Sequence, residues 1–136
     1  MNIKRMRISY LYLTALMCVS AILMSHRTVD SADSVEGTWI RNGDNLKVAI
    51  DHGNASIIDD GNSKFPCDVS AQLIYKDIRK VKDNHWTCDF LVVTMGSCAT
   101  NYESGEIFID RAGHLVVICP GFTSKVYTKI KPRYDS

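Results

Sequence analysis

The stretch that decides the fold is Val-Glu-Gly-Thr-Trp-Ile at residues 35–40. It places Gly37 two residues before Trp39, directly ahead of a series of short alternating segments. A glycine lets the backbone approach a neighbouring chain closely, and a tryptophan brings a large apolar side chain to the same place. We therefore expect Trp39 to be buried and to close one end of an all-β core.

The residues after this stretch show no helical period of useful length. Short β-branched and aromatic runs alternate with turn residues, such as Asn-Gly at 42–43 and Pro-Gly at 120–121, and this alternation is typical of antiparallel strands. The expected strands are residues 37–41, 46–51, 55–58, 69–78, 85–95, 106–110, 115–119 and 122–130. About eight short strands in sequential order predict a small antiparallel up-and-down barrel, because closure removes exposed sheet edges.

The residues before this stretch have the pattern of a secretory leader. A basic segment at residues 4–7 precedes an apolar run at residues 8–19, as in signal peptides. We expect residues 1–21 to form the signal peptide, with a cut as late as residue 32 as an alternative. A membrane anchor stays open as a second interpretation, because the apolar run continues to Met24. The expected organisation is then a disordered lead-in at 22–35, a single β-barrel domain at 36–131 and a tail at 132–136.

Removal of the leader leaves a nearly neutral chain. The formal charge is +1 for the full chain and −2 after a cut at Ala32, because that cut removes four basic residues and one acidic residue. Nucleic-acid binding depends on clustered Lys and Arg side chains that neutralise phosphates. The charge therefore predicts no nucleic-acid partner. The leader predicts a secreted protein, extracellular or periplasmic, with no membrane contact apart from the leader.

Four cysteines follow the leader: Cys67, Cys88, Cys98 and Cys119. An even number in an exported chain predicts two disulfides with the pairing left open. Their spacing lacks the close pairs of zinc sites, so we expect no metal. A straight meander leaves Cys88 inside a strand and far from the other three. A bent fifth strand, a different strand order or a buried thiol at Cys88 are the alternatives.

The combination of Gly37-Thr38-Trp39 with a β meander resembles the calycin superfamily, which includes lipocalins and avidins and carries Gly-x-Trp on its first strand. The segment at residues 106–113 is also similar to a strand-turn segment of avidins. The resemblance implies an up-and-down barrel whose tryptophan packs under a basic residue after the last strand, here Lys131 or Arg133. Barrel closure is thus assigned to Gly37, Trp39, Lys131 and Arg133. Arg41 stands where avidins have asparagine, and the resemblance carries over no ligand-binding residue.

The sequence contains no catalytic motif. His52, His85 and His114 each occupy a turn or a strand end, where a solvated histidine is the ordinary outcome. The acidic run at residues 59–63 lacks the order of a calcium loop, and there is no Gly-x-Ser-x-Gly. We therefore expect neither an enzyme nor a cofactor. Asn54 begins an Asn-x-Ser sequon and is a candidate for glycosylation in an exported chain.

Aromatic residues on the expected strands are the one positive indication of binding. They either line a ligand cavity or fill the core, as large side chains of a small domain commonly do. The candidate ligand-binding residues are Tyr75, Trp86, Phe90, Phe108 and Phe122. The sequence thus favours a secreted β-barrel that binds a small apolar ligand or an extracellular protein partner. The alternative is a secreted inhibitor or structural interaction protein that acts through its loops and has no cavity.

Overall fold

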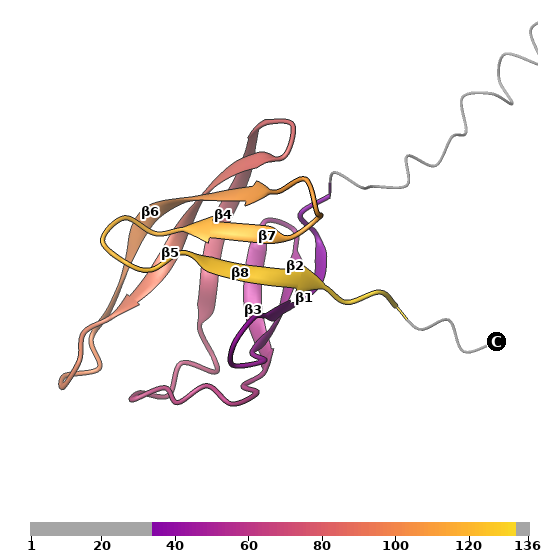
Figure 1. Ribbon diagram of the computed structural model, residues 1–136. Helices are drawn as coiled ribbons and strands as arrows, with labels where there is room; N and C mark the ends of the chain where they lie inside the picture. Colours follow the sequence, from indigo (N-terminus) through magenta and orange to yellow (C-terminus); the bar gives the residue numbers. More distant parts are fainter. Residues whose placement is uncertain (1–33, 133–136) are drawn as a thin grey trace, which may run out of the picture. The chain divides into compact units, whose positions relative to one another are not determined.

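Eight antiparallel strands follow one another around a closed barrel (Figure 1). The computed structural model describes residues 34–132. The strands are β1 (Gly37–Arg41), β2 (Lys47–Asp51), β3 (Asn54–Asp59), β4 (Leu73–Lys82), β5 (His85–Val93), β6 (Thr100–Ile109), β7 (Leu115–Ile118) and β8 (Lys125–Lys129). The pairing of β1 with β8 closes the sheet. The predicted fold class is confirmed, and the architecture is consistent with a calycin-like fold.

The predicted leader and Arg133 lie outside the described residues. Within residues 34–132 there is no helix, and hence none that is long and apolar enough to cross a membrane. Of the predicted lead-in at residues 22–35, only the last two residues are described, and one of them, Val35, is buried in the core.

Inward-facing side chains of every strand fill the barrel. In β2, Val48 and Ile50 are buried whereas Asp51 is exposed, which is the alternation that a half-buried strand requires. These residues join one hydrophobic cluster with inward residues from the other strands. The largest fully buried side chains are Trp39, Tyr127, Leu46, Ile50, Ile107, Leu115, Val48 and Val117.

Trp39 lies at the seam where the first strand meets the last. Its side chain is 1% exposed, and its Nε1 donates a hydrogen bond to the Val35 carbonyl at 2.8 Å. The Lys129 ammonium lies 5.1 Å from the indole centroid and donates to the Ser34 carbonyl at 3.2 Å. Gly37 has φ +122°, and a Cβ there would come within 3.1 Å of Lys129 Cε. The seam therefore needs both the glycine and the tryptophan.

Among residues 34–132 the basic residue over Trp39 is Lys129 and not the expected Lys131, whereas Arg133 lies outside the described residues. The register of β1 and β8 places Lys129 directly opposite Trp39, so the cation is the last residue of the strand and does not follow it. Lys131 is exposed.

We expect Trp39→Ala to lower the free energy of unfolding by about 3–5 kcal/mol, because it leaves a cavity at the seam. Lys129→Met should cost about 0.5–1 kcal/mol through the lost cation–π contact, and Lys131→Met should cost nothing measurable. Urea unfolding followed by circular dichroism compares the three variants. An equal loss for Lys129→Met and Lys131→Met would contradict the register.

Two strands differ most from their predicted ranges. The predicted strand at 69–78 begins later and runs to Lys82, because residues 69–72 form a turn in which the Gln72 amide donates to the Val69 carbonyl. The predicted strand at 106–110 begins at Thr100, because Thr100 pairs with Val93 of β5. The polar first half of β6 is a strand only because it pairs with β5, and the local sequence pattern does not indicate a strand there.

One disulfide is present among the described residues, and the prediction of two is wrong. Cys67 and Cys98 are bonded with a Cα–Cα distance of 5.7 Å, whereas Cys88 and Cys119 are buried free thiols. Cys88 pairs with Gly105 of β6, and the β6–β7 register places Cys119 on the other side of Gly105. One full strand therefore separates them, which puts their Cα atoms about 9–10 Å apart and beyond the roughly 7 Å limit for a disulfide.

We expect the Cys67–Cys98 bond to stabilise the fold by about 3–4 kcal/mol, because it closes a loop with a sequence separation of 31. The double variant Cys67→Ser/Cys98→Ser should show that loss in urea unfolding, and reductant should lower the stability of the wild type to the same level. Reductant should leave the double variant unchanged. A further loss on reducing the double variant would reveal a second disulfide.

Candidate functional site

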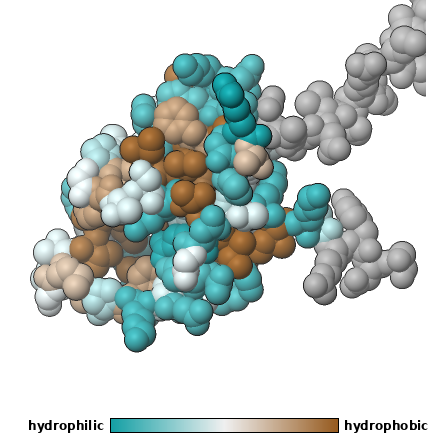
Figure 2. Space-filling view, viewed as in Figure 1, coloured by the Kyte–Doolittle hydropathy of each residue, from teal (hydrophilic) through white to brown (hydrophobic). Residues whose placement is uncertain are grey.

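A cavity of about 170 Å³ opens at one end of the barrel. We call this the loop end; it is formed by the connections at residues 42–46, 60–72, 94–99 and 119–124, and it lies opposite Gly37. Several of these loops lie at the left and lower left of Figure 1. Figure 2 shows hydrophobic atoms at the left of the same view as well as across its centre. The cavity lining is Arg41, Leu46, Phe65, Val69, Ile74, Tyr75, Phe90, Leu91, Val92, Val93, Cys119, Phe122 and Lys125.

Strands β4 and β5 supply the rigid walls of this cavity. Phe90 of β5 is buried and pairs with Tyr75 of β4. Its ring packs edge-on against Phe122 at a centroid distance of 5.7 Å. Gly105 leaves room for Phe90, because a Cβ at Gly105 would come within 2.9 Å of the Phe90 ring. Phe65 and Phe122 are exposed at their outer edges and form the rim.

Three of the five aromatic residues singled out in the sequence meet at this cavity: Tyr75, Phe90 and Phe122. Trp86 does not line it, because Trp86 lies near the start of β5, at the end of the barrel opposite the loop end. Phe108 faces the outside of the barrel and stacks on His85 with a centroid distance of 4.2 Å. The ligand-binding role of these residues stays a prediction.

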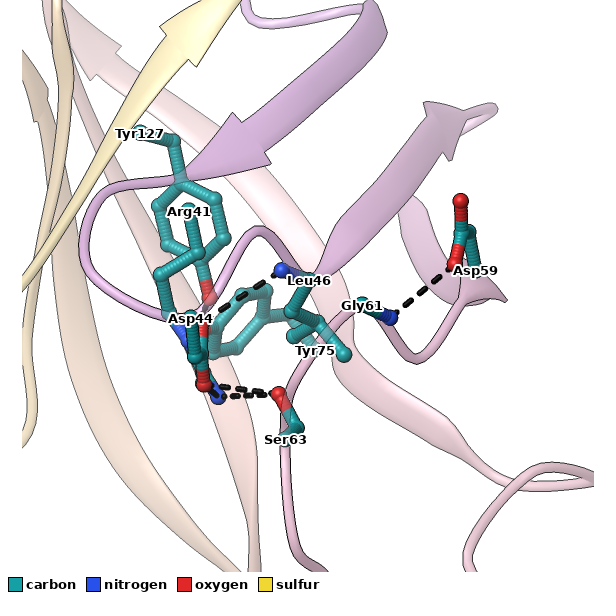
Figure 3. Close-up of polar contacts among 8 residues, drawn as sticks. All are labelled: Arg41, Asp44, Leu46, Asp59, Gly61, Ser63, Tyr75 and Tyr127. Atoms are coloured by element: carbon teal, nitrogen blue, oxygen red, sulfur yellow. Dashed lines mark hydrogen bonds and ion pairs between the residues drawn. The ribbon is translucent and has the colours of Figure 1, made fainter.

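A polar network braces one side of the cavity (Figure 3). Arg41 forms an ion pair with Asp44, in which Arg41 Nε donates to Asp44 Oδ1 at 2.9 Å. The Ser63 hydroxyl donates to Asp44 Oδ2 at 2.6 Å, and the Leu46 amide donates to Asp44 Oδ1 at 3.3 Å. Asp44 thus joins the β1–β2 turn to the long loop before β4.

These contacts shift the pKa of both charged groups. The Arg41 hydrogen bond holds the pKa of the Asp44 carboxyl well below its usual range, and the Ser63 hydroxyl and Leu46 amide add to this effect. The pKa of Arg41 is raised, chiefly by its hydrogen bond to Asp44. Arg41 and Asp44 therefore remain charged and satisfy each other at neutral pH.

Two buried tyrosines make a polar contact beside the cavity, and one of them, Tyr75, lines it. The hydroxyls of Tyr75 and Tyr127 lie 2.7 Å apart, and their rings meet edge-on. Burial raises the pKa of Tyr75 well above its ordinary value, and burial also raises the pKa of Tyr127. Both phenols are neutral at physiological pH and can donate or accept hydrogen bonds.

The cavity also contains a thiol and a second cation. Burial raises the pKa of Cys119 to about 11, although nearby Lys125 lowers it. Burial and the neighbouring Cys119 raise the pKa of Cys88 to about 12. Since a thiolate is the reactive form of cysteine, both thiols are poor nucleophiles at neutral pH.

Sequence reasoning missed Arg41, Cys119 and Lys125 as cavity residues. The sequence gives a weak indication for Arg41, because Asp44 follows it across the Asn-Gly turn and can pair with it there. It gives no indication for Lys125, since a single lysine in an expected strand cannot be told from any exposed lysine.

The remaining candidates lie elsewhere. His52 and His114 pair with Asp51 and Asp110, and residues 34–132 contain no cluster of three or more metal-binding side chains. Asn54 is exposed at the start of β3, at the end opposite the cavity. Asp59 accepts a hydrogen bond from the Gly61 amide (Figure 3), which makes residues 59–61 a turn.

Comparison of the chain with protein-family models, curated proteins and solved structures gives no match. The function proposed below therefore rests on the geometry of the loop end.

We expect Asp44 to make the fold acid-sensitive. Its pKa falls on folding, so its contribution to stability is complete above its unfolded pKa of about 4 and is lost as pH falls toward the lower folded pKa. The wild type should therefore lose more unfolding free energy than Asp44→Asn between about pH 5 and pH 2. Urea unfolding at a series of pH values measures the difference.

Asp60→Asn is the matched control, because Asp60 is exposed and its carboxylate has no hydrogen bond within the described residues. It should keep the acid sensitivity of the wild type. If Asp44→Asn lost stability as steeply as Asp60→Asn, the pairing of Asp44 with Arg41 would be contradicted.

Proposed function

We propose that the chain is a secreted binding protein of calycin type that holds one small, largely apolar ligand in the cavity at the loop end. The observation that carries this proposal is the cavity itself. Its volume of about 170 Å³ is close to the roughly 150 Å³ of an apolar protein cavity that binds benzene. The ligand is therefore about the size of a single ring or a short alkyl chain, smaller than most drug-like molecules.

Pre-organisation supports a binding role. The Cys67–Cys98 bond ties the loop at 60–72 to the loop at 94–99, and the Asp44 contacts tie the turn at 42–46 to the same 60–72 loop. A ligand that enters a formed cavity loses less free energy to loop ordering than one that must order its site. Phe65 and Phe122 at the rim lie where they can cover a ligand.

Other features agree with this proposal. The basic and apolar leader and the disulfide support export. A glycan on Asn54 would leave the cavity open, since Asn54 lies at the opposite end of the barrel. The raised pKa values of Cys88 and Cys119 support binding and not nucleophilic catalysis.

A second candidate function is docking of an extracellular protein on the loop end. Three apolar side chains from three different loops are exposed there: Phe65, Met95 and Phe122. Exposed apolar side chains that gather at one end favour a protein contact. This candidate corresponds to the inhibitor or interaction protein expected as the alternative, and it needs no ligand in the cavity.

Alkylation of Cys119 tests the first candidate, because this thiol lines the cavity. The reaction of Cys119 with iodoacetamide is run at about pH 9, where more of this thiol is ionised than at neutral pH, and is followed by peptide mass spectrometry. Single-ring and short-chain compounds should slow it. Val92→Phe should abolish this protection by filling the cavity. Val116→Phe is the matched control, since Val116 lies on the outer face of β7, and it should preserve the protection.

Absence of protection by every compound, in wild-type protein that is folded by circular dichroism, would contradict the small-ligand function. Loss of protection in Val116→Phe as well would place the ligand elsewhere. Native mass spectrometry of the protein from its source separates the two candidates, because it detects either a bound small molecule or a bound protein.

A further inference from the structure

We infer that the ligand is a small carboxylate, whose apolar part fills the cavity at the loop end and whose anionic group pairs with Lys125. This inference rests on the proposed function and adds the chemical class of the ligand. It follows from the balance of charge in the cavity lining, which neither the fold nor the aromatic residues determine.

Lys125 is the unpaired cation of the cavity. The lining includes two basic side chains, Arg41 and Lys125. The charge of Arg41 is neutralised by its ion pair with Asp44. Lys125 is partly buried and forms no ion pair with any described residue between 34 and 132. An ammonium group that borders an apolar cavity without a carboxylate partner can pair with the anionic group of a ligand.

No carboxylate is placed to neutralise Lys125 inside the cavity. The described lining contains neither Asp nor Glu. Glu103 pairs in register with Phe90, but it is exposed and does not line the cavity. Asp44 borders a shallow depression together with Lys125, yet its two oxygens are engaged by Arg41, Ser63 and the Leu46 amide. The cavity therefore presents a net positive charge to a ligand.

The position of Lys125 fits an amphiphilic acid. Lys125 begins β8, next to the rim that Phe122 forms on the same connection. Phe90 lies deeper and is buried. An apolar ring or chain against Phe90 thus leaves a carboxylate near the ammonium group at the rim. A charge-assisted hydrogen bond is about twice as strong as a neutral one, so the charge distinguishes an acid from its alcohol of the same shape.

The experiment compares acids with alcohols of matched size by isothermal titration calorimetry. The pairs are benzoate with benzyl alcohol and hexanoate with hexanol. Wild-type protein should bind at least one acid about tenfold more tightly than the matched alcohol. Lys125→Met, which keeps the apolar stem, should bind that acid and its alcohol equally, and Lys125→Arg should retain the preference. Lys131→Met is the control, because Lys131 is exposed and does not line the cavity.

The outcomes separate this inference from the proposed function. Equal binding of acid and alcohol by the wild type, with Cys119 protected by both, overturns the carboxylate and leaves the small-ligand function standing. A preference for the acid that persists in Lys125→Met overturns the role of Lys125. No binding of any compound overturns the proposed function and the inference with it. Lys125→Gln replaces Lys125→Met if thermal unfolding shows that the methionine variant is not folded.

Discussion

Closure of the sheet between β1 and β8 is the constraint on which the rest of the structure depends. Trp39 carries it, because its indole is buried at the seam, bonded to the Val35 carbonyl and covered by Lys129. Without this pairing β1 and β8 would be open edges, and a two-edged sheet of this size would expose its apolar face. The closed barrel instead has two ends, and the cavity opens at the loop end.

The open end owes its shape to polar and covalent contacts and not to hydrophobic filling. Asp44 joins the first turn to the loop before β4, and the Cys67–Cys98 bond joins that loop to the connection between β5 and β6. Gly105 leaves the space into which Phe90 fits. A cavity persists because the loops are held in place around it, and Lys125 remains at its rim without a counter-charge among the residues that line it.

The sequence predicted the strand order and the buried tryptophan, since alternation and turn residues are local signals. The bounds of β1 were predicted correctly, but the polar start of β6 was missed because only pairing with Val93 makes Thr100 part of a strand. Cysteine count suggested a second disulfide that the register excludes. Three aromatic cavity residues were found through their alternation. Lys125 was missed, because the role of a single lysine depends on the residues that the fold places around it.

We propose that this barrel binds a small ligand inside its loop end. Methyl-group NMR tests it most directly, because Leu46 and Val92 line the cavity whereas Val116 and Val126 lie on the outer face of β7 and β8. Titration with benzoate or with hexanoate should, for at least one of the two, shift the methyl signals of Leu46 and Val92 in a saturable manner and leave those of Val116 and Val126 in place. Shifts confined to Val116 and Val126, or no saturable shift at all, would contradict the claim.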